Sequence, residues 1–374
     1  MCIEQGWPVV GFQPAYLMRN FAFSQSKMQA NFWPSGVCIA HDFLATLQPL
    51  LSGRAVHLFV DAEAARCHSS LLAQLQVQSR FVVPSGEQHK TLQTATHMWQ
   101  HLLAVGADRA GLVLAVGGGV TTDMAAFVAS TYMRGLPVVL CPTTLLSQVD
   151  ASVGGKTGID FEGGKNLIGT FYQPEQVVIW PGFLATLPPR QLLSGYAEVL
   201  KHGLIADAAY WDHCKAGLPT GPVALAEVVT HSVSLKAQVV QQDPTEKGLR
   251  KILNFGHTLG HAIESYYLAT DEPLLHGEAV ALGMLLEARL AALKTGLPMA
   301  AVQEIAHVLT GLGYPTRLPA QAVPAVLQLM RLDKKNRSGS FRFSLLRAIG
   351  QCDYDIEVSE ALVTQSIAES QTPW

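Results

Sequence analysis

The stretch LVLAVGGGVTTDMAAFVASTYM, residues 112–133, carries the pattern that decides the fold. Its five leading apolar residues predict a short buried strand, three glycines follow, and residues 124–133 have helical character. A strand that passes through glycines into a helix is typical of a parallel sheet flanked by helices. The same alternation of strand-like and helical stretches continues at 55–60, 91–105, 138–141 and 177–180. The first half of the chain therefore predicts an α/β domain.

The second half of the sequence has a different character. After Leu187-Pro188-Pro189 come long stretches with helical spacing, at 191–205, 223–240, 252–267, 278–293 and 300–312. One strand-like pair is expected near residues 341–346. Because 374 residues are too many for one core, we expect two domains, an α/β domain over 1–187 and an essentially all-α domain over 188–374.

The composition narrows the class of protein. About half of the residues, 49%, are apolar and only 15% are charged, which is typical of a globular enzyme and not of a disordered chain. A net charge of -3 gives no electrostatic reason to expect a nucleic-acid partner. The six cysteines are scattered without a C-x-x-C pair, as in reduced thiols. With no signal-peptide pattern and no apolar run of roughly 20 residues, we expect a cytoplasmic protein without a membrane partner.

Polar residues at the ends of the predicted strands form a candidate nucleotide site. Asp61 ends one strand, residues 85–90 follow another, and residues 143–144 follow a third. The glycines 117–119, with Asp123 beyond them, favour a close approach of backbone N–H groups to a phosphate at a helix N-terminus. Ligands bind at the carboxyl ends of strands in open α/β sheets. A tight structural turn and ordinary solvated loops remain the alternative interpretation of these segments.

Three histidines and a glutamate form a candidate metal site. His257 and His261 are spaced i, i+4 and share one face of a predicted helix, and His276 follows fifteen residues later. Glu198 lies in the predicted helix 191–205, and two imidazoles with a carboxylate are a usual zinc set. The spacing leaves open which histidines bind, and buried or surface histidines without a metal are the common alternative. The pattern is not H-E-x-x-H, so a zinc protease is disfavoured.

Five longer motifs resemble the 3-dehydroquinate synthase family of sugar-phosphate cyclases. They are QVDASVGGKTG (148–158), GKNLIG (164–169), GYAEVLK (195–201), GLRKILNFGHTLGH (248–261) and HGEAV (276–280). The resemblance extends from about residue 55 to the end of the sequence, in the family's order.

This resemblance implies a fold, an activity and cofactors. The family has a Rossmann-like NAD domain followed by a helical domain that binds Zn²⁺ or Co²⁺. It is a carbon–oxygen lyase that converts 3-deoxy-D-arabino-heptulosonate 7-phosphate to 3-dehydroquinate and phosphate in the shikimate pathway, restoring NAD⁺ each turn. The resemblance also implies a homodimer in which Arg134 reaches the neighbouring subunit's phosphate site.

Site residues follow from the resemblance, position by position. The implied metal ligands are Glu198, His257 and His276, which makes His261 a substrate contact. With Asp61 from the strand-end argument, the cofactor residues are Glu87, Lys90, Gly118, Gly119, Asp123, Thr143, Thr144, Lys156, Lys165, Phe183 and Thr186. The substrate residues are Asp150, Lys156, Lys165, Asn166, Lys201, Lys236, Arg250, Asn254, His261 and one of the pair Lys334 and Lys335.

Two positions depart from the family pattern. Thr121-Thr122 stands where the glycine turn usually has another glycine, and a threonine is strained if that position needs a positive φ. Trp180-Pro181 replaces an acidic pair that is often found there.

Three alternatives stay open. Another sugar-phosphate cyclase, for example one similar to 2-epi-5-epi-valiolone synthase, is the nearest, but Lys236, Arg250 and Asn254 favour a substrate that bears a carboxylate. A metal-dependent polyol dehydrogenase of the same fold would release NADH and would not need clustered lysines. A non-catalytic binding relative is disfavoured by the intact candidate metal ligands.

Overall fold

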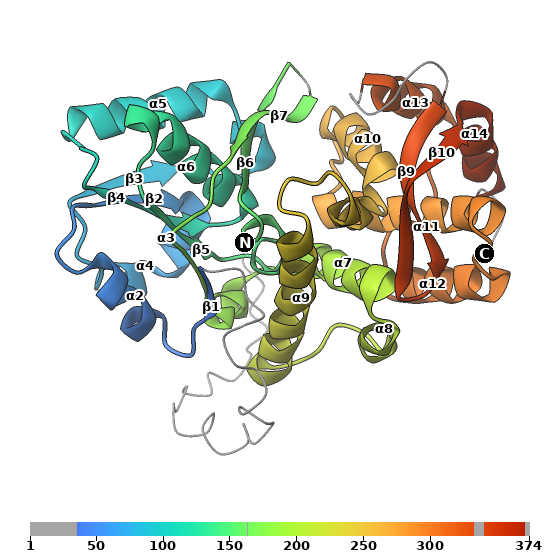
Figure 1. The fold of residues 1–374 in the computed structure, drawn as a ribbon, viewed down its shortest axis with the longest axis horizontal. Coiled ribbons are helices and arrows are strands. Elements are labelled where there is room, and N and C mark those ends of the chain that lie inside the picture. The colour runs from blue at the N-terminus through green and yellow to red at the C-terminus, as the bar shows by residue number, and fades with distance from the viewer. Residues whose placement is uncertain (1–35, 163, 333–339, 371–374) are drawn as a thin grey trace.

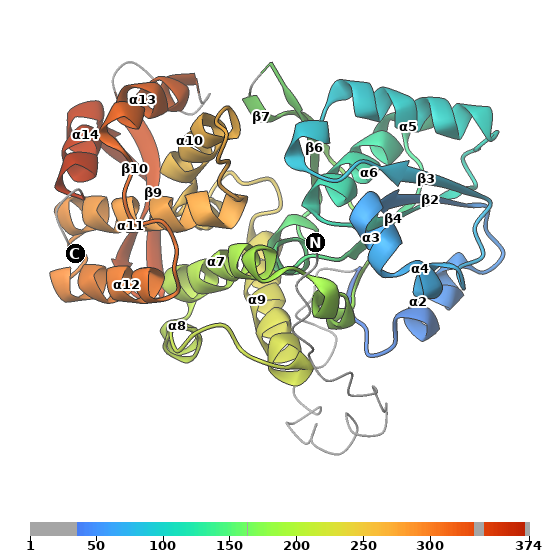
Figure 2. The ribbon, with the colours of Figure 1, turned by 180° about the vertical axis from the view of Figure 1, so that it is seen from behind.

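The computed structural model describes residues 36–162, 164–332 and 340–370. An α/β part and a mainly helical part lie side by side, with α9 (Pro222–Gln242) at their junction (Figures 1 and 2). The predicted substrate residue Lys335, with its neighbour Lys334, lies outside the described residues.

The α/β part is built on a six-stranded parallel sheet with the order β1-β8-β5-β4-β2-β3. Its strands are β1 (Val37–Ile39), β2 (Val56–Asp61), β3 (Ser79–Val83), β4 (Leu112–Gly117), β5 (Val138–Pro142) and β8 (Gln176–Ile179). The four strand predictions over the first half are thereby confirmed. The chain order reverses between β2 and β4, which is the place where sheets of this kind bind ligands.

Helices cover both faces of this sheet (Figure 1). They are α2 (Phe43–Leu51), α3 (Ala62–Cys67), α4 (Ser69–Leu72), α5 (Leu92–Ala104) and α6 (Gly119–Thr131). All six residues of β4 are buried, and its side chains enter two cores alternately: Val113 and Ala115 one, Leu114 and Val116 the other. Burial on both faces explains why this strand reads as a continuous apolar run.

An antiparallel hairpin that we did not predict follows β5. It consists of β6 (Lys156–Phe161) and β7 (Gly164–Phe171), and it stands between the two parts of the molecule (Figure 1). Short helical turns flank the sheet: η1 (Glu87–His89), η2 (Tyr132–Arg134), η3 (Ser147–Ala151) and η4 (Pro181–Thr186). The hairpin carries the predicted site residues Lys156, Lys165 and Asn166, so it brings them toward the second part.

The second part is mainly helical, as predicted. Its helices are α7 (Pro189–Ala206), α8 (Ala208–Cys214), α9 (Pro222–Gln242), α10 (His257–Leu268), α11 (His276–Lys294), α12 (Met299–Gly311), α13 (Val323–Leu332) and α14 (Glu360–Glu369), with the turns η5 (Leu249–Asn254) and η6 (Ala320–Ala322). The expected strand pair is longer than predicted, β9 (Ser340–Ala348) with β10 (Gln351–Ser359). The helical part therefore contains the expected strand pair, which packs against α11 and η5.

The helix predicted over 252–267 is wrong at its start, because the chain breaks at Phe255 and Gly256. Gly256 has a φ of 80°, and a Cβ there would lie 2.4 Å from the Cγ of Met284. Only glycine fits this close left-handed turn. The break makes His257 the first residue of α10.

One helix in the described part of the chain, α9, is long and apolar enough to cross a membrane by length and composition alone. Part of its surface is buried in the protein, and it packs against η3, α7 and η5. The buried side of α9 includes Lys236. These contacts identify α9 as a packing helix between the two parts.

Candidate active site

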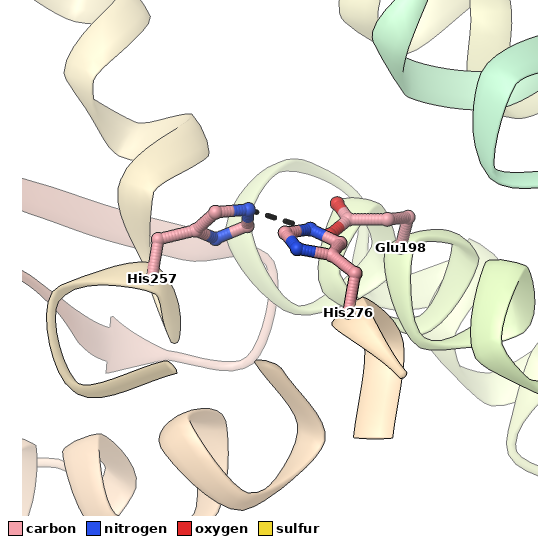
Figure 3. Close-up of side chains that lie close together, drawn as sticks. All are labelled: Glu198, His257 and His276. Atoms are coloured by element: carbon pink, nitrogen blue, oxygen red, sulfur yellow. Dashed lines mark ion pairs between the residues drawn. The ribbon is translucent and has the colours of Figure 1, made fainter. Parts of the chain in front are cut away.

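Three predicted metal ligands converge from three helices. Glu198 lies within α7, and His257 and His276 are the first residues of α10 and α11. Both imidazole Nε2 atoms face the same oxygen of Glu198, at 3.4 Å from His257 and 3.5 Å from His276. Figure 3 shows the two rings and the carboxylate pointing toward one another. The three ligand atoms lie within 4.8 Å of one another, so they form one site.

The chemistry of Glu198 fits a divalent cation. Its side chain is fully buried, and neither carboxylate oxygen accepts a hydrogen bond of regular geometry from the described residues. Lys201, one turn along α7, forms an ion pair with it. Burial raises the pKa of Glu198, but the lowering by Lys201 and His257 is larger. The net pKa is well below its ordinary value. The carboxylate is therefore ionised and able to bind a cation.

The pKa values of the two histidines are shifted in opposite directions by their surroundings. Burial and the nearby Lys201 hold the pKa of His257 well below its ordinary value, and its Nδ1 lies 3.2 Å from the carbonyl of Phe255. Burial lowers the pKa of His276 too, but Glu264 and Glu198 outweigh it and raise the pKa to about 10. In both rings Nε2 is the nitrogen directed at Glu198. The predicted ligand atoms are therefore the two Nε2 atoms.

His261 lies beside the triad of Glu198, His257 and His276 but is not one of its three converging residues. Its ring centroid is 5.0 Å from that of His257 and 5.9 Å from that of His276. The ligand atoms that lie within 4.8 Å of one another are those of Glu198, His257 and His276, and His261 does not belong to this group. This placement agrees with the prediction that His261 contacts a substrate next to the metal ligands.

A second cluster of charges adjoins the triad. Asp150 in η3 accepts from Lys236 on α9, with 2.6 Å between Nζ and Oδ1. Burial raises the pKa of Asp150, but Lys236 and Lys201 lower it more strongly. His202 on α7 is 1% exposed, and its Nε2 lies 3.9 Å from the same oxygen of Asp150. Neither ring nitrogen of His202 has a hydrogen-bond partner among the described residues.

Arg250 in η5 is a buried cation without a close acidic partner in the described structure. Its Nη1 donates to the carbonyls of Gly154 at 3.0 Å and Pro244 at 2.7 Å, while its Nε has no partner among the described residues. Gly154 is required here, because a Cβ would lie 2.4 Å from Nη2 of Arg250. A guanidinium held by carbonyls keeps its positive charge available for an anion.

Glu246 connects two predicted substrate residues, Lys156 and Asn254. It forms an ion pair with Lys156 of β6, and its Oε1 accepts from the amide of Asn254 at 2.8 Å. Sequence reasoning missed Glu246, because a single glutamate in a polar loop gives no signal.

The predicted nucleotide residues gather at the β2–β4 switch point. A Cβ on Gly117 would lie 2.8 Å from the Cβ of Asp61, and one on Gly118 would lie 3.1 Å from the side chain of Thr144. Gly119 begins α6, so backbone N–H groups of a helix N-terminus face this edge. Glycine is needed at these positions because there is little room for a side chain. A positive φ is not the reason, since Gly118 has a φ of -70°. The site thus fits a phosphate-bearing cofactor.

The backbone strain that the sequence suggested at Thr121 and Thr122 does not occur. Both threonines lie inside α6, where neither has a positive φ. The hydroxyl of Thr122 donates to the carbonyls of Gly118 at 3.2 Å and Gly119 at 3.1 Å. The turn therefore forms without a further glycine.

Lys90 ties the glycine turn to the hairpin. Its Nζ donates to Asp123 at 2.5 Å and to the side-chain oxygen of Asn166 at 2.7 Å. Lys165, the neighbour of Asn166, pairs with Glu87 at 2.9 Å. The predicted cofactor residues of η1, α6 and β7 are thus in contact with one another.

The remaining predicted residues are more dispersed. Asp61 accepts from the backbone of Glu63 and Ala64 and so caps α3. Thr143 is buried at the end of β5. Phe183 is buried, and its ring centroid lies 4.9 Å from that of Trp180. The hydroxyl of Thr186 lies 2.9 Å from Nε2 of His68. Arg134 in η2 is exposed, and no hydrogen bond or ion pair joins its side chain to the site residues described above.

Sequence reasoning also missed two buried glutamates that support the histidines. Glu264 accepts from Nδ1 of His276 at 3.1 Å. Glu287 on α11 accepts from the backbone N–H groups of Gly256 at 2.6 Å and Leu259 at 3.0 Å, and so caps α10. Burial raises the pKa of Glu287 to about 8. The H-x-x-x-H-x-x-E spacing places Glu264 one turn after His261, which is the only local signal for it.

Comparison with known proteins shows similarity to 3-dehydroquinate synthases over most of the chain. The family described as 3-dehydroquinate synthase N-terminal matches residues 80–194, and 3-dehydroquinate synthase C-terminal matches residues 195–336. The 3-dehydroquinate synthase of Bordetella pertussis is 46% identical over 291 residues, which cover 77% of this chain and 81% of that protein.

Two solved structures show the same fold. A 2-epi-5-epi-valiolone synthase from Streptomyces hygroscopicus, with NAD⁺ and Zn²⁺ bound, has a TM-score of 0.81 at 29% identity and covers 90% of this chain and 97% of its own. A 2-deoxy-scyllo-inosose synthase, in complex with carbaglucose-6-phosphate, NAD⁺ and Co²⁺, has a TM-score of 0.78 at 26% identity and covers 89% and 96%. With the two family matches and the curated relative, these findings establish that the chain belongs to the 3-dehydroquinate synthase family.

Proposed function

We propose that this chain converts 3-deoxy-D-arabino-heptulosonate 7-phosphate to 3-dehydroquinate and phosphate, as a carbon–oxygen lyase. The observation that carries the proposal is the juxtaposition of the triad Glu198, His257 and His276 with buried lysines on α7 and α9. A sugar acid that carries both a carboxylate and a phosphate needs several cations around one reacting centre, and this junction supplies them.

The proposed cofactors are NAD and one Zn²⁺ or Co²⁺ ion. Glu198, His257 and His276 would hold the ion, and the glycine turn with Glu87, Lys90 and Asp123 would hold NAD. Such groups supply a reversible hydride acceptor and a Lewis acid that acidifies a bound hydroxyl. The ionised, otherwise unsatisfied carboxylate of Glu198 and the close space at Gly118 support this assignment.

The chain's own residues bind and orient the substrate. Arg250 and Lys236 offer buried positive charge to the carboxylate and phosphate, and Lys201 keeps Glu198 ionised. Lys156 is half-exposed and pairs with Glu246, so an anionic substrate can exchange for that partner. Holding one flexible molecule through oxidation, elimination and ring closure is mainly a matter of orientation.

Asp150 and His261 are the proposed proton-handling groups. Asp150 is held ionised by Lys236 and Lys201, which suits a group that accepts a hydrogen bond from a substrate hydroxyl. The ring centroid of His261 lies 5.0 Å from that of His257 and 5.9 Å from that of His276, the two predicted metal-binding imidazoles. A proton can therefore be received next to the metal ligands without displacing one of them.

The proposed assembly is a homodimer. The hairpin exposes Phe161, Leu167 and Phe171, and Met133 beside Arg134 is exposed as well. The hairpin and η2 are neighbours, because a Cβ on Gly135 would lie 3.3 Å from the hydroxyl of Tyr172. Covering such apolar side chains with a second copy is favourable. Met133 and Arg134 both have a positive φ, a strained backbone conformation of the kind that is found at functional sites.

We place the enzyme in the cytoplasm. The cysteines in the described part of the chain are all free, as in a reducing compartment.

Phosphate release is the test of this function. The purified protein is incubated with the heptulosonate 7-phosphate, NAD⁺ and Zn²⁺, and phosphate and NADH are measured together. The proposal expects stoichiometric phosphate without net NADH. Phosphate released only from sedoheptulose 7-phosphate or glucose 6-phosphate would assign a different cyclase, and net NADH would assign a dehydrogenase.

A further inference from the structure

Glu264 on α10 is a buried carboxylate that holds two partners on opposite oxygens. Its Oε2 accepts from Nδ1 of His276 at 3.1 Å, and its Oε1 accepts from Nζ of Lys165 at 2.5 Å. The side chain is only 7% exposed. Two charge-assisted hydrogen bonds in a buried position fix the orientation of both partners.

The contact with His276 sets which ring nitrogen is free. A histidine that donates from Nδ1 to a carboxylate directs its Nε2 to the opposite side of the ring, and that atom is 3.5 Å from Oε1 of Glu198. A carboxylate behind a metal-binding histidine also makes the imidazole a stronger ligand. His257 is held in the same sense by a neutral carbonyl, that of Phe255. Of the two imidazoles, His276 therefore has the charged support.

The contact with Lys165 crosses between the two parts of the molecule. Lys165 belongs to β7, and its Nζ also pairs with Glu87 in η1 at 2.9 Å. Glu87, Lys165, Glu264 and His276 thus form one continuous chain of alternating charge. One end of this chain is the predicted cofactor loop and the other is the predicted metal site.

We propose that Glu264 is a positioning residue that orients His276 for metal binding and, through Lys165, couples the metal site to the NAD site. This inference rests on the proposed function, in which His276 binds the ion and Glu87 and Lys165 contact NAD. Occupancy of the cofactor loop orders Lys165, Lys165 orders Glu264, and Glu264 orders His276. Each ligand therefore increases the affinity for the other, since such coupling is reciprocal.

The primary test is the metal affinity of Glu264→Gln. Zn²⁺ binding is measured by competition with a chromophoric chelator, on the full chain and without substrate. Glutamine keeps the shape of the side chain but is neutral, so His276 loses its charged hydrogen-bond acceptor, and we expect the Zn²⁺ affinity to fall by about 10- to 100-fold. The matched control is Glu304→Gln, which removes a carboxylate that pairs with Lys215 at 2.9 Å on the remote α12. The control is expected to bind Zn²⁺ as the wild type does.

The second test repeats these titrations with saturating NAD⁺. In the wild type we expect NAD⁺ to increase the Zn²⁺ affinity about fivefold or more. In Glu264→Gln and in Lys165→Met this factor should fall to about one, whereas Lys165→Met should retain most of its Zn²⁺ affinity without NAD⁺. Lys165→Met also tests the link if Glu264→Gln does not fold.

The outcomes separate this inference from the proposed function. Wild-type Zn²⁺ affinity in folded Glu264→Gln, or an undiminished NAD⁺ effect in Lys165→Met, would overturn the role of Glu264. Failure of the wild-type protein to bind Zn²⁺, or undiminished binding in His276→Ala, would instead overturn the proposed metal site.

Discussion

Lys236 donates from its Nζ to two oxygens of Asp150, the carboxylate Oδ1 at 2.6 Å and the main-chain carbonyl at 2.6 Å. The lysine is on α9 and the aspartate is in η3, so the pair connects the helical part to the end of the α/β part. Because the lysine is only 7% exposed, its charge depends on this partner.

Breaking this pair should destabilise the fold. Lys236→Met is expected to lower the free energy of unfolding by about 3 kcal/mol, because Asp150 then keeps a half-buried charge without its nearest partner. A double-mutant cycle with Asp150→Asn in urea unfolding should give a coupling of about 2 kcal/mol. The matched control is the pair Lys251 and Asp355, which has the same 2.6 Å separation but is more exposed. Its coupling should be below about 1 kcal/mol, and equal couplings would contradict the argument.

The proton-handling and substrate-binding residues should be separable from stability. Lys156→Ala and His261→Ala are each expected to lower the turnover number by about 100-fold or more, with little change in the unfolding midpoint. Phosphate release under saturating substrate is the measurement. Lys251→Ala, on the exposed pair, is the control and should keep wild-type turnover. Near-normal turnover in either site variant would refute its assigned role.

Removal of the divalent cation should stop the reaction reversibly. Dialysis against a strong chelator is expected to abolish phosphate release, and Zn²⁺ or Co²⁺ should restore it. His257→Ala should not be restored to wild-type activity at the same metal concentration, because the Nε2 that faces Glu198 is lost. An enzyme that works equally well after chelation would rule out the proposed metal site.

His202 should make the fold sensitive to acid. Burial, with the charge of Lys201, lowers its pKa to about 3 from an ordinary value of 6.5. The folded state therefore binds fewer protons than the unfolded state between these values. The free energy of unfolding contributed by this group falls as the pH drops from 6.5, by about 1.4 kcal/mol per pH unit.

The difference between wild type and His202→Leu isolates this contribution from other groups. Urea unfolding between pH 4 and 8 should show that the variant loses less stability than the wild type below about pH 6.5. His307→Leu, at an exposed histidine on α12, should run parallel to the wild type. Parallel curves for His202→Leu would mean that the histidine is not buried in its neutral form.

Subunit mixing tests the proposed role of Arg134. Arg134→Ala and His261→Ala should each be nearly inactive alone, because each lacks one part of every site. After subunit exchange, half of the dimers are mixed and each mixed dimer has one intact site, so roughly a quarter of wild-type activity should return. No recovery, with exchange confirmed by differently tagged chains, would exclude a site shared between subunits.

The sequence predicted the elements well where the signal was local. The strand runs such as 112–116 formed as expected, because a central strand buried on both faces is apolar throughout. The helix predicted over 252–267 was wrong at its start. Its break depends on Gly256 meeting Met284 of another helix, and a periodic pattern carries no information about such a contact.

The hairpin β6–β7 was missed for a related reason. Most residues of β7 are exposed, three consecutive residues of β6 are buried, and both strands contain glycine, so they lack the alternation by which a strand is recognised. The charged residues of the site were predicted from motifs, but Glu264 and Glu246 were not. A glutamate that supports another residue looks like any surface glutamate until its partner is known.

By itself, the sequence determined the fold class, the family and the kinds of residue available for chemistry, because these follow from local patterns and from long motifs. Only the tertiary structure decided how they combine. Lys236 meets Asp150 across 86 positions, and Lys165 meets Glu264 across 99. Such contacts arise when two parts of the chain pack together, so they depend on the whole core and not on any one segment. That packing also separated Glu198, His257 and His276 from His261, which spacing alone could not do.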